Sequence, residues 1–64
     1  MIIQEYDKVR LKSGEVVRVV EVLGKGAAFV VEIYKEGEGL TIEQVLFEEI
    51  SSIIKEVEYP LLAT

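Results

Sequence analysis

The chain has 64 residues, close to the smallest size at which one hydrophobic core supports a fold without disulfides or metals. It contains neither cysteine nor histidine, which excludes disulfides, thiolate metal sites and histidine-based acid–base catalysis. Half of the residues are hydrophobic. The formal net charge of −5 argues against a nucleic-acid interface, because such interfaces are basic. We expect one small domain that is not an enzyme.

The N-terminal residues do not resemble a secretory leader. Met1, Ile2 and Ile3 are followed at once by polar and acidic residues, and no apolar run in the chain approaches the length of a membrane span. We therefore expect a cytoplasmic protein without a membrane partner.

Glycine-containing turns at 13–14, 24–26 and 37–39 divide the chain. The stretches between them are rich in Val, Ile, Phe and Tyr, the residues that suit a pleated, half-buried surface. This pattern predicts strands at about 7–12, 15–23 and 27–36.

Three-residue hairpin loops at 12–14 and 24–26 would fix the register of these strands. Val9 then faces Val17, Val19 faces Val31, and Arg18 faces Glu32. Because directly paired residues share a face, one face becomes a core; its members are Val9, Leu11, Val17, Val19, Leu23, Phe29, Val31 and Ile33. Glu21 is the one misfit, opposite Phe29.

The opposite face of this predicted sheet is half apolar, whereas an outer face usually alternates to polar residues. Its apolar members are Val16, Val20, Val22, Ala28, Val30 and Tyr34. Leu61 and Leu62, which follow Pro60, also need cover from water. We predict that these eight residues form an interface at which copies of the chain pack together. The tail that carries Leu61 and Leu62 would either cross onto a neighbouring copy or cover the apolar residues of this face.

Residues 41–58 allow two interpretations. Apolar residues recur at three- and four-residue spacing, and Thr41 with Gln44 could form a capping box, which favours a helix over 42–58 after a three-stranded meander. The high β-branched content instead favours a strand at 41–47, a helical turn at 47–50 and a strand at 51–58.

The run Tyr6-Asp7-Lys8-Val9-Arg10-Leu11-Lys12-Ser13-Gly14, followed by Val19-Val20-Glu21-Val22-Leu23, resembles the opening of short, mostly uncharacterised bacterial SH3-like small-barrel proteins. Glu48-Glu49-Ile50 resembles their acidic step before the last strand. The sequence departs from their pattern at Val16–Val17, where those proteins often carry a glycine. The resemblance implies a mainly β fold: a five-stranded small barrel over 1–59 with a helical turn near 47–50, then a tail at 60–64.

Candidate chemistry is sparse. Glu43, Glu48 and Glu49 could in principle act as paired carboxylates, and Gly24-Lys25-Gly26 as a phosphate loop. A solvated acidic face and an ordinary turn explain both patterns, so we predict no catalytic, cofactor-binding or metal-binding residue and no cofactor. Lys8, Arg10, Lys12 and Arg18 would share a strand face and could form a small basic patch.

These observations favour a non-enzymatic interaction module that self-associates through its apolar sheet face and binds a protein partner. One alternative is a nucleic-acid or nucleoprotein accessory protein that uses the basic patch. Another is a small-ligand binder or minor subunit of a complex, with a pocket between protomers lined by Tyr34 and acidic residues.

Overall fold

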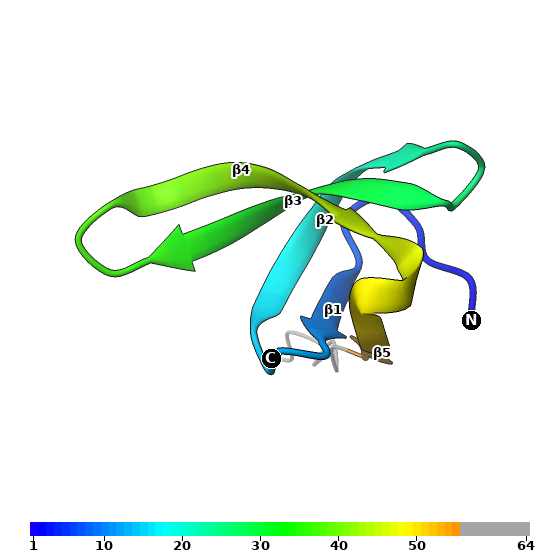
Figure 1. Ribbon diagram of the computed structural model, residues 1–64, viewed down its shortest axis with the longest axis horizontal. Coiled ribbons are helices and arrows are strands. Elements are labelled where there is room, and N and C mark those ends of the chain that lie inside the picture. The colour runs from blue at the N-terminus through cyan, green and yellow to red at the C-terminus, as the bar shows by residue number, and fades with distance from the viewer. Residues whose placement is uncertain (56–64) are drawn as a thin grey trace, which may run out of the picture.

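The computed structural model describes residues 1–55, which form five antiparallel strands and one 3-10 turn (Figure 1). The elements are β1 (Lys8–Leu11), β2 (Val16–Leu23), β3 (Ala28–Lys35), β4 (Gly39–Leu46), η1 (Phe47–Glu49) and β5 (Ile50–Ile54). The fold is therefore mainly β, and the alternative of a C-terminal helix beginning at 42 is wrong. The three- and four-residue spacing of apolar residues in this segment is a coincidence of two strands, β4 and β5, that follow each other across the turn η1.

The strands form a single sheet in the order β4-β3-β2-β1-β5. β2 belongs to two halves of this sheet, because its first residues pair with β1 and its later residues pair with β3. Figure 1 shows the β3–β4 hairpin crossing over the half formed by β1, β5 and the start of β2. The predicted closure into a barrel is not observed, because η1 carries the chain across the core to β1 and leaves β4 and β5 as the two edges.

A β-bulge in β2 changes the predicted register. The pairings of Arg18 with Glu32 and of Val19 with Val31 are confirmed, but Glu21 then pairs with Val30, and Val20 between them is the extra residue. The following loop has four residues (24–27) instead of three, and Leu23 pairs with Ala28. Because side chains alternate between faces, the extra residue moves each side chain from Glu21 to Leu23 to the face opposite the predicted one.

The core lies between the two halves of the bent sheet. Most of the predicted core residues are buried, and Ile3, Val45 and Ile50 join them; the buried cluster is Ile3, Val9, Leu11, Val17, Val19, Phe29, Val31, Ile33, Val45 and Ile50. Leu23, predicted in the core, is only half-buried and lies outside this cluster. The N-terminal segment that carries Ile3 is tied to β2, since the backbone N–H of Tyr6 donates to the carbonyl of Val19 at 2.7 Å.

Candidate functional site: an apolar outer face

The sheet has a second face on the side away from the core, built by the alternate residues of β2, β3 and β4. In β3, Val31 and Ile33 point into the core, so Glu32 and Tyr34 point outward. Cross-strand pairing then brings Ile42 of β4 beside Glu32 and Leu40 beside Tyr34. The row of Arg18, Glu32 and Ile42 thus runs across three strands, and Tyr34 and Leu40 form a second row across two.

We call six of the apolar side chains on this outward side the apolar outer face: Val16, Val20, Val30, Tyr34, Leu40 and Ile42. Tyr34 is 70% exposed, Leu40 61% and Ile42 59%. A shallow hollow of about 400 Å³ lies between Val16, Tyr34 and Leu40. Such a concentration of exposed large apolar side chains on one side of a small domain is typical of an interaction surface.

The structure changes the membership of the predicted apolar face. Four of its predicted members lie on the outward side, as expected: Val16, Val20, Val30 and Tyr34. Val22 is not, because the bulge turns it inward, where it packs against the core. Ala28 is outward by alternation but buried, at 8% exposure, with Leu23 and Leu46 paired on either side of it.

Leu40 and Ile42 were missed by sequence reasoning, and Leu61 and Leu62 lie outside the described residues. A signal for the first two exists in the glycine-containing turn at 37–39. A hairpin that pairs Lys35 with Gly39 places Leu40 opposite Tyr34 and Ile42 opposite Glu32, and this is the observed register.

The basic residues of β1 and β2 border the apolar outer face but do not form the predicted four-residue patch. Lys8 pairs with Arg18, whose guanidinium Nη1 donates to the carbonyl of Tyr6 at 2.9 Å. Arg10 reaches the carbonyl of Gly14 at 3.4 Å. Lys12 lies in the turn after β1 and lines a groove on the core side with Glu48 and Glu49 instead.

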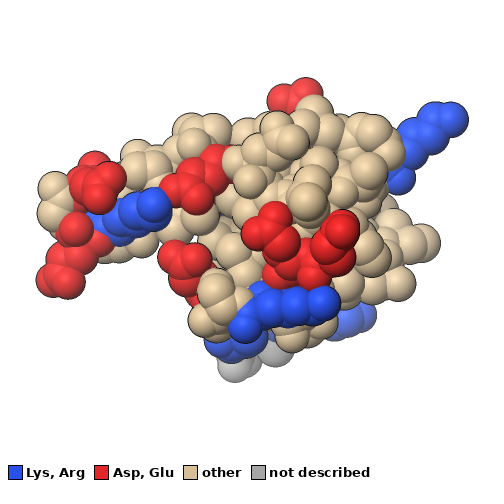
Figure 2. Space-filling model, in the orientation of Figure 1, with Lys and Arg blue, Asp and Glu red and all other residues tan. Residues whose placement is uncertain are grey.

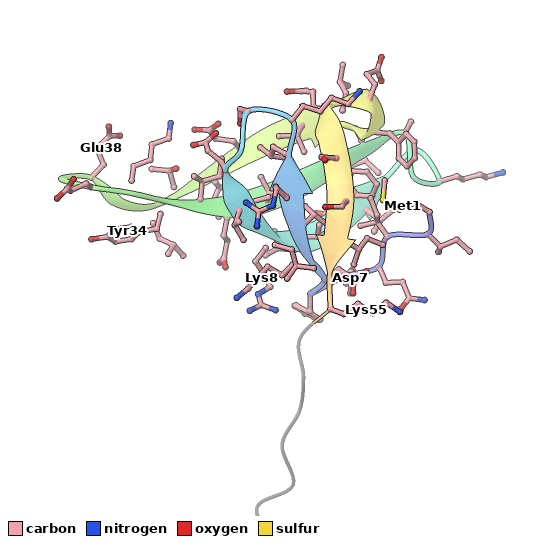
Figure 3. All side chains as sticks on the ribbon, turned by 90° about the horizontal axis from the view of Figure 1, so that it is seen from below. Met1, Asp7, Lys8, Tyr34, Glu38 and Lys55 are labelled. Atoms are coloured by element: carbon pink, nitrogen blue, oxygen red, sulfur yellow. The ribbon has the colours of Figure 1, made fainter. Side chains whose placement is uncertain are left out.

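The β3–β4 hairpin extends past the body of the molecule as a two-stranded arm (Figure 1). Figure 3 shows Tyr34 and Glu38 on opposite sides of this arm. Its one basic residue, Lys35, bridges to the carboxylate of Glu43 at 2.5 Å, and Figure 2 shows the blue side chain of the arm flanked by red ones. The hydrogen bond and negative charge of Glu43 raise the pKa of Lys35 above its usual 10.5.

Acidic side chains gather elsewhere, in the groove that Lys12 also lines. Glu15, Glu43, Glu48 and Glu49 contribute to it. Among residues 1–55, no three carboxylates come close enough together to hold a metal ion. In the same part of the chain the one helical segment is the three-residue turn η1, far too short to cross a membrane.

No family model matches this chain, and comparison with curated proteins and with solved structures finds no significant match. We therefore argue function from the chain's own geometry.

Proposed function

We propose that this protein is a non-enzymatic interaction module that self-associates through its apolar outer face and, once assembled, binds a protein partner. The observation that supports it is the joint exposure of Tyr34, Leu40 and Ile42 on one side of neighbouring strands, where each is more than half exposed. A soluble domain with this surface gains stability when the surface is covered.

The expected gain from covering this surface is comparable to the cost of bringing two chains together. Full burial of a large apolar side chain contributes about 1.5–3 kcal/mol. Against this gain, the loss of translational and rotational freedom on association costs about 4–15 kcal/mol. Several such side chains must therefore act together, and the apolar outer face provides six.

We also propose that the fold belongs to the SH3-like class, with a sheet that stays open. Five antiparallel strands and a helical turn at 47–49, immediately before the last strand, support this assignment. They occur where the resemblance of 6–14 and 48–50 to SH3-like small-barrel proteins implies them. Because small barrels serve many functions, the class by itself does not select a partner.

The experiment that tests self-association is the molar mass in solution, measured by light scattering on a sizing column over a wide concentration range. We expect a fixed multiple of the 7.2 kDa chain. Ile42→Ser should shift this mass to that of the monomer, because it removes an exposed side chain of the apolar outer face.

Ile2→Ser is a matched control for this test. It is the same chemical change at a residue that is 81% exposed but lies in the N-terminal segment, where it lines hollows with Tyr6 and Ile53 and with none of the six residues of the apolar outer face. It should leave the mass unchanged. A wild-type chain that stays monomeric at high concentration would contradict the proposal, and so would an Ile42→Ser variant that associates as the wild type does.

A further inference from the structure

We infer that the second copy of the chain adds at the free edge of β4, so that two sheets pair antiparallel and become one continuous sheet. This inference rests on the proposed self-association and specifies the strand through which it occurs. The occupant of the edge is thus another β4, related to the first by a two-fold axis.

Hydrogen-bond directions show which backbone groups of β4 are available. The Phe47 N–H donates to the Ala27 carbonyl at 2.9 Å, and the hydroxyl of Thr41 donates to the Ile33 carbonyl at 3.1 Å, so these β3-side carbonyls point toward β4. Hydrogen-bonded pairs alternate along an antiparallel ladder. The intervening residues therefore direct their N–H and C=O groups away from β3; they are Leu40, Ile42, Gln44 and Leu46.

One of these four outward N–H groups is already satisfied, because the Leu46 N–H donates to the Glu49 carboxylate at 2.8 Å. That bond closes the end of β4 near η1. It leaves the stretch from Leu40 to Gln44 as the part of the edge on which a further strand can form hydrogen bonds.

The edge lacks the features that usually prevent pairing with another chain. β4 is eight residues long and contains no Lys, Arg or Pro. Its one charged residue, Glu43, belongs to the opposite face, where it forms an ion pair with Lys35. The other edge strand, β5, is shorter, and its exposed residues Ser51 and Ser52 are polar, so it offers no comparable apolar contact.

Charge and side-chain position restrict the register. A two-fold axis at Glu43 would place two like charges directly opposite each other, which destabilises a pair of strands. An axis at Ile42 instead places Ile42 of each copy beside the same residue of the other, and Thr41 opposite Glu43. The side chains of Leu40 and Ile42 then lie beside those of Gln44 and Ile42 of the other copy, and the two apolar outer faces become neighbours in one sheet.

Amide hydrogen exchange of the wild-type protein tests this inference residue by residue. The N–H groups of Leu40, Ile42 and Gln44 should exchange at least tenfold more slowly at concentrations where the chain is associated than where it is monomeric. The N–H groups of Thr41, Glu43 and Val45 face β3 and should be protected in both conditions, which makes them controls within the same strand.

A backbone variant gives a second test. Gln44→Pro removes one outward N–H and leaves every apolar side chain in place, and edge strands accept proline where the N–H faces solvent. It should raise the dissociation constant of the assembly at least tenfold. Gln44→Thr retains the N–H and should change that constant less than threefold.

The outcomes separate this inference from the proposal on which it rests. If the wild-type chain associates while the Leu40, Ile42 and Gln44 amides exchange equally fast in both states, pairing at β4 is refuted and self-association stands. Protection that appears in β5 instead would refute it in the same way. A monomer at every concentration would overturn both.

Discussion

At the scale of single residues, the ion pair between Lys35 and Glu43 has a measurable consequence. Glu43 raises the pKa of Lys35 through a hydrogen bond and its charge. We predict that Glu43→Gln lowers the pKa of Lys35 toward 10.5, as an NMR titration of the lysine side chain would show. Equal Lys35 pKa values in both proteins would contradict the pairing.

The sign of the pH effect on stability follows from the same shift. A base whose pKa is raised on folding stabilises the folded state fully below its unfolded pKa, and the contribution disappears as pH rises through the folded pKa. The stability difference between the wild type and Glu43→Gln that depends on Lys35 should therefore be complete below about pH 10.5 and disappear as the pH rises through the higher pKa that Lys35 has in the folded protein. Because both side chains are partly exposed, added salt should reduce it at neutral pH.

At Glu21 the alternation of side chains along β2 conflicts with the charge of the residue. Alternation alone placed it in the core opposite Phe29, an environment that a lone carboxylate does not tolerate. The bulge beside Val20 resolves that conflict, because it turns Glu21 outward and Val22 inward. The misfit was visible in the sequence, but alternation alone gave no sign of the extra residue between Val19 and Glu21 that relieves it.

At the scale of elements, the turn of the β3–β4 hairpin depends on glycine. Gly37 has φ +87° and follows Glu36 in a turn closed by the Glu38 N–H, which donates to the Lys35 carbonyl at 3.0 Å. This position requires a positive φ, which an L side chain adopts only at a cost. A Cβ at Gly37 would meet nothing within 4 Å, so the cost of adding one is confined to the backbone.

We predict that Gly37→Ala lowers the free energy of unfolding by about 1 kcal/mol, measured by urea denaturation. Glu36→Ala, at the neighbouring exposed position of the same turn, is the control and should change the free energy by less than about 0.5 kcal/mol. If the two variants are equally stable, the left-handed conformation of Gly37 does not limit the hairpin.

The segment from β4 to β5 could not be resolved from its sequence for a physical reason. The spacing of its apolar residues favours a helix whereas its β-branched content favours strands, and the choice depends on contacts outside the segment. β4 is held by its full-length pairing with β3, and β5 by its pairing with β1. Between them, Phe47 anchors the turn η1 by lying against Phe29, with ring centroids 6.5 Å apart.

At the scale of the whole molecule, the core is small relative to the chain. A domain of this length has a total stability of about 3–10 kcal/mol. We predict that Val31→Ala, at a side chain with no exposure, costs about 2–3 kcal/mol in urea denaturation, because it removes two buried carbons and leaves a cavity.

The matched control is Val16→Ala, which makes the same change at a side chain that is 42% exposed on the apolar outer face. Measured on the monomer, it should cost less than about 1 kcal/mol. Equal costs at Val16 and Val31 would mean that the core does not lie between the two halves of the sheet.

Alternation and turn chemistry act over a few neighbouring residues, so they were enough to predict the three N-terminal strands, the positions of their glycine-containing turns and the pairing of Arg18 with Glu32. The folded structure was needed to show the bulge in β2, the pairing of β5 with β1 and the exposure of Leu40 and Ile42. These features depend on contacts between residues far apart in the chain. A shift of one residue inverts every side chain beyond it, so local patterns cannot fix which face meets water.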